Sequence, residues 1–396
     1  MDSIEIKTTK LEDYYRIFWS DKIGSGANGN VYSCLCKKTW KNYAVKIIPD
    51  RPRARREIEM QMACQSSRYV VPIFDVYSNS CEKLNKNKRN KYIFIIMENM
   101  RGGELFSLIE NHSDVLNEAH WCKIIKQIVL GLKDIHELGI IHRDLKPENI
   151  FIKDDYSINQ FSSVDETVND MEIMIGDFGF AVEAHTRPCE ALFTPYYVAP
   201  EILANDLRYR DESEDKLQTP YDSRCDMWSL GVVMYALISN IPPFYPEIHS
   251  KTMTKRMYNN ILTGTFHFQY NIWKSISYEV KELISDLVQV NPDDRVTMEE
   301  VMQHSWFKNM GNAFESEQST LSEVSLGGLC GIHDKMLKSG SHTDSETKEY
   351  NFSWIASSSN DSESSDVEFT DNGKYTVRLI IQLDNTWAQR RLPIIH

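Results

Sequence analysis

The sequence has no long apolar run and no excess of basic side chains. No stretch approaches the roughly 20 apolar residues that span a bilayer, and the N-terminal residues MDSIEIKTTKLEDYY hold neither a basic nor a hydrophobic region. We therefore expect a protein of the cytoplasm and nucleus, without a membrane as partner. Acidic residues outnumber basic ones by 57 to 44, and the net charge of −13 argues against nucleic acid as a partner.

The sequence also lacks a cysteine pattern that would bind a metal. Its eight cysteines are scattered, and the short spacing of Cys34 and Cys36 is not repeated elsewhere. We interpret them as reduced core thiols rather than redox groups. With 396 residues, of which 41% are hydrophobic, the chain is long enough for one large two-lobed domain and a tail.

Hydrophobic spacing divides the domain into two lobes. Residues 19–48 alternate polar and apolar side chains around a glycine cluster, which predicts strands joined by a tight loop. After Glu98 the spacing becomes helical, in residues 121–136, 229–239 and 280–290. We predict an α+β, bilobal fold with a small β-rich lobe at residues 17–98 and a large helical lobe at residues 99–307.

Residues 308–396 differ in composition from the rest of the chain. Residues 310–365 contain 14 serines, and residues 310–396 contain 13 acidic and 7 basic side chains. Such a segment cannot bury enough apolar surface to offset the entropy lost on ordering, so we predict a disordered tail.

A glycine cluster in the small lobe is the first motif that carries chemistry. Glycines allow a backbone to fold closely over phosphates, although the same string also marks dinucleotide-binding folds. Here Ala44 and Lys46 follow in a strand, where a dinucleotide-binding fold would have an acidic residue. We therefore expect ATP to contact Lys46, Ala44 and the cluster, which consists of Ile23, Gly24, Ser25, Gly26, Ala27, Asn28, Gly29, Asn30 and Val31.

Lys46 needs an anion to hold it in place. Glu57, in the helical stretch ARREIEM, is the natural choice, and Glu59 is the competing carboxylate. Alternatively, Glu57 is one charge on a solvated helix face.

The string IHRDLKPEN at residues 141–149 has every defining position of a protein-kinase catalytic loop. Its residues predict distinct tasks: Asp144 aligns the substrate hydroxyl and accepts its proton, and Lys146 offsets charge on the γ-phosphate. Asn149, together with Asp177 of the Asp-Phe-Gly string, would bind Mg²⁺. Lysine at position 146 is typical of kinases that act on serine and threonine.

A second class of function is a catalytically weak scaffold that keeps the kinase fold only to bind partner proteins. The presence of every catalytic residue weighs against it. Structural roles are expected for Glu201, which would pair with Arg295, and for Asp226, which would brace the catalytic loop.

From about Leu11 to Phe307 the chain resembles the MAP kinase-activated protein kinases of the calcium/calmodulin-dependent kinase group. The strings that carry the resemblance are DRPRARREIEM, MRGGELFSLI, GDFGFAV, FTPYYVAPEIL and CDMWSLGVVMYALISNIPPFY. FTPYYVAP and a long insertion before CDMWSLG are similar to the branch called MAP kinase-activated protein kinase 5. The resemblance implies a bilobal kinase fold, Mg²⁺ as cofactor, and ATP held at a hinge that includes Glu98 and Met100, behind Met97.

Two carboxylates suggest which substrates are preferred. Glu104 and Glu148 occupy positions where basophilic relatives of this group bind an arginine three residues before the acceptor. We therefore expect protein substrates with an Arg-x-x-Ser/Thr motif. The alternative is that Glu104 is merely exposed at a helix start.

The activation segment departs from the family pattern. Relatives carry a Thr-Pro that a MAP kinase phosphorylates, whereas this chain has Glu190 and then Ala191 at those positions. The remaining Thr-Pro, Thr194-Pro195, belongs to the substrate-binding segment. Glu190 is either a built-in partial mimic of phosphothreonine or an ordinary loop residue, with regulation moved elsewhere or lost.

The C-terminal residues 375–396 set apolar side chains on both sides of the basic pair Arg390-Arg391. This arrangement suits a short peptide that docks in a MAP kinase groove. It suits equally a tail strand or helix that packs back on the kinase domain.

Overall fold

The computed structural model describes residues 5–26, 29–81, 83–84, 90–112, 115–155, 163–184, 194–210, 222–245 and 251–311. Three predictions lie outside the described residues. They concern Ala27 and Asn28 of the glycine cluster, Glu190, and the tail from residue 312 onward, with its docking segment.

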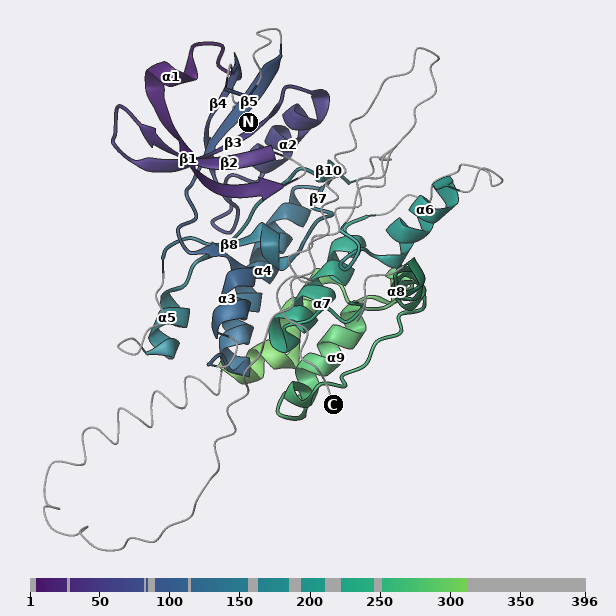
Figure 1. Cartoon of the computed structure of the whole chain (residues 1–396). Coiled ribbons are helices and arrows are strands. Elements are labelled where there is room, and N and C mark those ends of the chain that lie inside the picture. Colours follow the sequence, from purple (N-terminus) through teal and green to yellow (C-terminus); the bar gives the residue numbers. More distant parts are fainter. Residues whose placement is uncertain are drawn as a thin grey trace, which may run out of the picture. The chain divides into compact units, whose positions relative to one another are not determined.

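The small lobe is built on a five-stranded antiparallel sheet with the strand order β1-β2-β3-β5-β4 (Figure 1). Its elements are α1 Leu11–Tyr14, β1 Tyr15–Gly26, β2 Gly29–Cys36, β3 Asn42–Pro49, α2 Pro52–Ala63, β4 Ile73–Ser80 and β5 Lys91–Met97. In β5, Phe94 and Ile96 join one hydrophobic cluster, while Ile93 and Ile95 join the cluster that includes α2. The strand is therefore apolar along its length because both of its faces are buried.

The large lobe consists mainly of helices packed around α7. Its longer helices are α3 Leu105–His112, α4 Glu118–Glu137, α6 Pro200–Arg210, α7 Arg224–Ser239, α8 Lys251–Thr263 and α9 Tyr278–Leu287. The shorter ones are η1 Pro147–Asn149, α5 Val164–Asp170, η2 Asn271–Lys274, η3 Pro292–Asp294 and α10 Met298–Gln303. Every residue of α7 from Cys225 to Ile238 is buried, as expected for a helix that is apolar all around.

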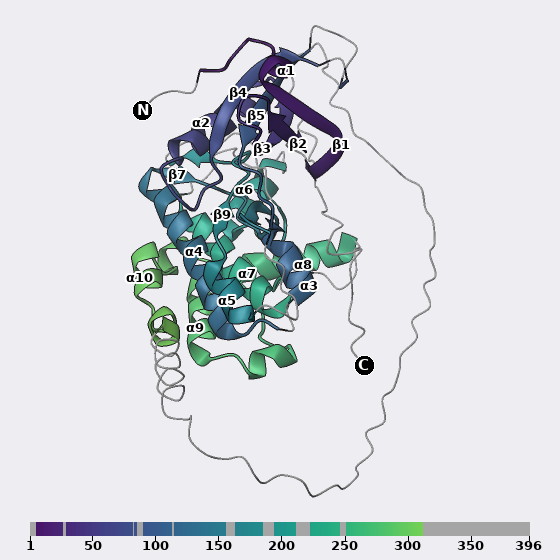
Figure 2. The same cartoon turned by 90° about the vertical axis from the view of Figure 1, so that its left-hand side faces the viewer.

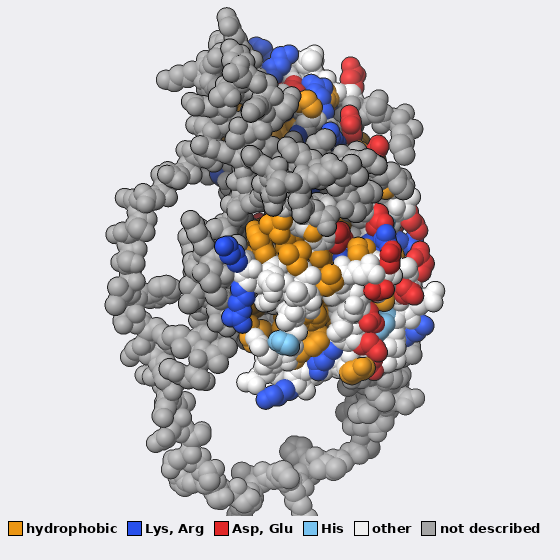
Figure 3. Space-filling model, turned by 90° about the vertical axis from the view of Figure 1, so that its right-hand side faces the viewer, with side chains coloured by type: hydrophobic (Ala, Val, Ile, Leu, Met, Phe, Trp, Pro, Cys, Tyr) orange, Lys and Arg blue, Asp and Glu red, His pale blue; other side chains and the backbone are white. Residues whose placement is uncertain are grey.

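On the side of this lobe that carries α6 and α8, apolar side chains gather in the centre and acidic ones along one edge (Figure 3). Figure 2 shows the sheet at one end and α4, α7 and α9 toward the other. Within the described part of the chain, every helix is too short or too polar to span a bilayer.

Short strands hold the loops between the lobes. β6 Gly103–Glu104, β8 Ile150–Ile152 and β9 Ile173–Ile175 form one antiparallel sheet, and β7 Ile140–Ile141 pairs with β10 Val182–Glu183. The catalytic loop runs from β7 to β8, and Asp-Phe-Gly lies between β9 and β10. Because both loops begin and end on these strands, their residues are brought together.

Four of the described cysteines, Cys34, Cys64, Cys122 and Cys225, are buried and free. Burial raises the pKa of the Cys34, Cys64 and Cys122 thiols to about 12, which keeps them protonated and unreactive. The expectation of reduced core thiols is confirmed for these four.

Candidate active site

Lys46 forms the centre of a buried charge cluster. Its Nζ lies 2.5 Å from Glu57 Oε1 and 2.9 Å from Asp177 Oδ1. The Glu57 side chain is only 4% exposed, whereas Glu59 is exposed on the other side of α2. The pairing of Lys46 with Glu57 is therefore present, and Glu57 does not lie on a solvated helix face.

Burial and charge act in opposite directions in this cluster. Burial would lower the pKa of Lys46, but the carboxylates of Asp177 and Glu57 outweigh it and raise that pKa. For Asp177 burial would raise the pKa, yet the Lys46 cation holds it well below its usual range. Burial raises the pKa of Glu57 more than Lys46 lowers it. At neutral pH Lys46 is therefore cationic and Asp177 is ionised.

The Asp144 carboxylate is held by hydrogen bonds at both oxygens. Asn149 Nδ2 donates to Asp144 Oδ2 at 2.8 Å and to the Asp144 carbonyl at 2.8 Å. Thr194 Oγ1 donates to Oδ1 at 2.6 Å, and Lys146 Nζ donates to Thr194 Oγ1 at 3.0 Å. Asp144 is thus a buried, oriented acceptor with a cation, Lys146, 3.4 Å from Oδ2.

Asp226, at the start of α7, supports the catalytic loop through hydrogen bonds to its backbone. Its fully buried carboxylate accepts hydrogen bonds from the backbone amides of His142 and Arg143, both at 2.8 Å, and lies 2.9 Å from His136 Nε2. Burial would raise the pKa of Asp226, but the hydrogen bond from His136 and the neighbouring donors lower it. Arg143 has a φ of 66°, an unfavourable conformation that the hydrogen bonds from the two backbone amides to Asp226 hold in place. The expected brace is present, and the role of His136 is one that sequence reasoning missed.

The expected pair of Glu201 and Arg295 is also present. Arg295 Nη1 and Nη2 donate to the two carboxylate oxygens at 2.8 and 2.7 Å, and the arginine side chain is fully buried. This two-pronged contact fixes α6, and with it the segment that carries Thr194, to the base of the large lobe.

The glycine cluster connects β1 to β2, which remain paired as far as Gly26 and Gly29. Ser25 Oγ donates to Asn30 Oδ1 at 3.2 Å, while Ile23 is 46% exposed. Gly29 has a φ of 134°, and a Cβ there would lie 2.5 Å from the carbonyl oxygen of Ile47. Glycine at this position therefore satisfies packing against β3, a reason that the sequence did not indicate.

The remaining predicted nucleotide contacts lie around the end of β5. Val31 pairs with Lys46, and Ala44 is buried opposite Met97. In the hinge, the Glu98 amide donates to the Pro72 carbonyl and the Met100 carbonyl accepts from Gly103. The Glu98 carbonyl and the Met100 amide are then the hinge groups that could meet an adenine edge.

Asn149 and Asp177 supply the oxygen donors that Mg²⁺ prefers. The Asn149 amide nitrogen is engaged by Asp144, which leaves its carbonyl oxygen as the atom to face a cation. Among the described residues no group of three or more His, Cys, Asp or Glu side chains could hold a metal. A Mg²⁺ ion held by Asn149 and Asp177 would complete its shell with phosphate oxygens and water.

Glu104 and Glu148 lie on β6 and η1, which contact each other. Both side chains are partly buried. Glu104 immediately precedes α3 and is not fully exposed there, so the two carboxylates are placed on neighbouring elements.

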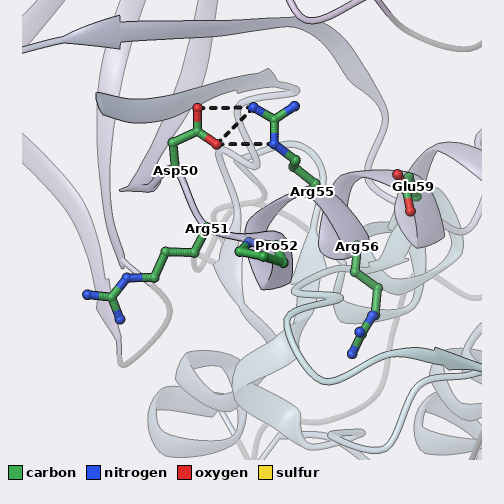
Figure 4. Close-up of a pocket in the computed structure, with 6 residues that line it drawn as sticks. All are labelled: Asp50, Arg51, Pro52, Arg55, Arg56 and Glu59. Carbon is green, nitrogen blue, oxygen red and sulfur yellow. Dashed lines mark hydrogen bonds and ion pairs between the residues drawn. The ribbon is translucent and has the colours of Figure 1, made fainter. Parts of the chain in front are cut away.

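A surface cavity of about 370 Å³ lies at the start of α2 (Figure 4). It is lined by Asp50, Arg51, Pro52, Arg55, Arg56 and Glu59. Figure 4 shows that Arg51 and Arg56 point in different directions, while Arg55 is bound to Asp50. The lining includes none of the predicted site residues.

Comparisons with known proteins agree with this geometry. The family described as "Protein kinase domain" matches residues 19–307. MAP kinase-activated protein kinase 5 of Homo sapiens is 36% identical over 340 residues, which cover 84% of this chain and 69% of the relative. MAP kinase-activated protein kinase 2 of Drosophila melanogaster is 36% identical over 306 residues, which cover 76% of this chain and 75% of the relative. The chain therefore belongs to the protein kinase family, as a serine/threonine kinase among the MAP kinase-activated protein kinases.

Proposed function

We propose that Asp144 and Lys146 carry out the transfer of the ATP γ-phosphate to serine and threonine of proteins that have an arginine three residues before the acceptor. The observation that supports these roles is the arrangement around Asp144, whose two carboxylate oxygens are oriented by Asn149 and Thr194 beside the Lys146 cation.

In this proposal the substrate hydroxyl oxygen forms a bond to the γ-phosphorus while the bond from phosphorus to the ADP oxygen breaks. Asp144 orients the hydroxyl and accepts its proton, and Lys146 offsets charge on the transferred group. Lys46, fixed by Glu57, contacts the phosphates that stay on ADP. Mg²⁺, held by Asn149 and Asp177, would neutralise phosphate charge.

The test is phosphorylation of an Arg-x-x-Ser peptide by purified protein, compared with Asp144→Ala. Activity that disappears in Asp144→Ala supports the proposal. Equal phosphate transfer by both proteins would exclude Asp144 as the base. No transfer by either would mean that an upstream activator is needed or that the motifs serve only for binding.

The preference for arginine is supported by Glu104 and Glu148 on the adjoining elements β6 and η1. Two carboxylates facing one guanidinium make a specific, charge-assisted contact. Peptides with Arg, Lys or Ala three residues before the acceptor should be phosphorylated with decreasing efficiency, in that order. Glu104→Gln and Glu148→Gln should each raise KM for the arginine peptide and leave KM for the alanine peptide unchanged, whereas an equal effect on both peptides would exclude direct arginine binding.

We further propose that Glu190 partly replaces the phosphothreonine of relatives, so that the kinase is active without phosphorylation of its activation segment. A glutamate carries one negative charge, where phosphothreonine carries about −1.5 to −2. A cation that could pair with that charge is Arg143, whose Nη1 donates to the Phe180 carbonyl at 3.3 Å. Protein produced without any MAP kinase should be active, and Glu190→Ala should lower this activity. Unchanged activity in Glu190→Ala would contradict the mimic.

The name of the relatives, MAP kinase-activated protein kinase, supports a place in MAP kinase signalling. We assign docking of a MAP kinase to residues 375–396, and deletion of these residues should abolish MAP kinase binding in a pull-down while leaving peptide phosphorylation intact. Retained binding would exclude this segment as the docking site. We place the protein in the cytoplasm and nucleus, which fluorescence microscopy of the tagged full chain can test.

A further inference from the structure

One side chain of α2 that belongs to no catalytic motif contacts the loop that carries Asp177. Arg53 Nε donates to the Gly179 carbonyl at 3.1 Å, and the Arg53 guanidinium lies over the Phe180 ring at 5.0 Å from its centroid. Arg53 precedes Glu57 by four residues, so both side chains leave the same face of the helix. We propose that Arg53 is a positioning residue that ties α2 to this loop and thereby keeps Glu57 and Asp177 together on Lys46.

The loop needs such a contact because its backbone is in an unfavourable conformation. Asp177 has a φ of 57°, in the left-handed region that side chains other than glycine seldom adopt. Residues of this kind persist where their surroundings over-determine them. Here the Gly179 amide donates to Asp177 Oδ1 at 3.2 Å. Arg53 donates to the carbonyl of the same glycine.

The next residue is held from the other lobe. Arg143 Nη1 donates to the Phe180 carbonyl, while Arg53 covers the Phe180 ring. Two guanidinium groups, one from α2 and one from the catalytic loop, therefore fix consecutive residues of the loop. Of these two guanidinium groups, only that of Arg53 lies on the same helix as Glu57, and loss of Arg53 would remove it.

Arg55 provides a matched control on the same helix. It is exposed and donates to both carboxylate oxygens of Asp50, at 3.0 and 3.1 Å, on a different side of α2 (Figure 4). Two residues along a helix correspond to about 200° of rotation, so Arg53 and Arg55 point in nearly opposite directions. Arg55→Gln removes the same charge and donors as Arg53→Gln without touching the loop.

The experiment compares the full-length chain with Arg53→Gln, Arg53→Lys, Phe180→Leu, the double variant of Arg53→Gln with Phe180→Leu, and the control Arg55→Gln. For each protein we would measure kcat with a peptide, the affinity for ADP with and without Mg²⁺ by calorimetry, and Tm. We expect Arg53→Gln to lower kcat about tenfold, as the loss of one charge-assisted hydrogen bond implies. Its ADP affinity should fall more when Mg²⁺ is present, because Asp177 then contributes in addition to Lys46, and Arg53→Lys should recover part of both effects.

Three outcomes would overturn the proposal. They are equal behaviour of Arg53→Gln and Arg55→Gln, a loss of ADP affinity that is the same with and without Mg²⁺, and additive effects of Arg53→Gln and Phe180→Leu on kcat. If Arg53→Gln fails to fold, Phe180→Leu alone must lower the Mg²⁺-dependent affinity, since it removes the ring contact and leaves the arginine. Because ADP binding requires no peptide, this result is independent of the arginine preference and of Glu190.

Discussion

Thr194 offers the sharpest test of the geometry at the proposed base. Its hydroxyl donates to Asp144 Oδ1 at 2.6 Å and accepts from Lys146 Nζ at 3.0 Å, so one oxygen links the base to the cation. Thr194→Val removes that oxygen but keeps the branched shape of the side chain. Thr194→Ser keeps the hydroxyl and removes only a methyl group.

The size of the effect follows from the bonds that remain. A hydrogen bond to a charged group contributes about 1.5–3 kcal/mol, which corresponds to roughly 10- to 100-fold in rate if it is lost entirely in the transition state. Asn149 still donates to Asp144 in the variant, and Lys146 still lies 3.4 Å from Oδ2, so the lower limit applies. We expect kcat of Thr194→Val to fall about tenfold at this lower limit.

Steady-state assays with varied ATP and varied peptide, together with Tm, would measure this. KM for ATP should not change, because Lys46 and the hinge are untouched, and Thr194→Ser should retain most of kcat. The reasoning is refuted if Thr194→Val keeps kcat within a factor of two of the wild type. A fall in kcat shared equally by Thr194→Ser would show that the methyl group, rather than the hydroxyl, matters.

Three further changes test the supporting structure. Gly29→Ala should lower the free energy of unfolding, measured in urea, by at least about 1–3 kcal/mol, which is the cost of the strained φ alone. Gly24→Ala, whose Cβ would lie 3.4 Å from Val31, should cost far less. Glu201→Ala leaves the Arg295 cation fully buried and should cost about 3–5 kcal/mol of unfolding free energy by calorimetry. Arg295→Met should cost less, because the carboxylate that it leaves behind, Glu201, is 16% exposed and can be hydrated. The lowered pKa of Asp226 contributes stability that is present above the unfolded carboxyl value of about 3.9 and is lost as the pH falls through the lower folded value. The difference in unfolding free energy between wild type and Asp226→Asn should therefore stay constant from about pH 8 to 5 and shrink only below about pH 4, and a difference that grew on acidification would contradict this sign.

The sequence predicted the residues of the site better than it predicted the reasons for some of them. Lys46, Asp144 and Asp226 could be found because each lies in a string whose spacing reflects its chemistry. The packing role of Gly29 could not, since it depends on how β2 lies against β3. Strands of two or three residues, such as β6 and β8, are too short to show a period of two. Their existence depends on pairing with chain segments far away in sequence.

Arg53 was missed for a related reason. Its acceptor is a backbone carbonyl 126 residues away, and a carbonyl has no sequence signature. The only signal was its position four residues before Glu57, which places it on the buried face of α2 but does not say what it meets there. A motif search therefore finds side chains that touch substrate more readily than side chains that hold the backbone behind them.

The two left-handed residues of the site, Arg143 and Asp177, show why the backbone needs support from several elements. Each such residue costs about 1–3 kcal/mol, which the contacts around it must offset. Asp226 does so for Arg143 from α7, while Lys46 and Arg53 act on the Asp177 loop from β3 and α2. The backbone of the site is therefore held from three sides, by α7 below the catalytic loop and by β3 and α2 beside the Asp177 loop.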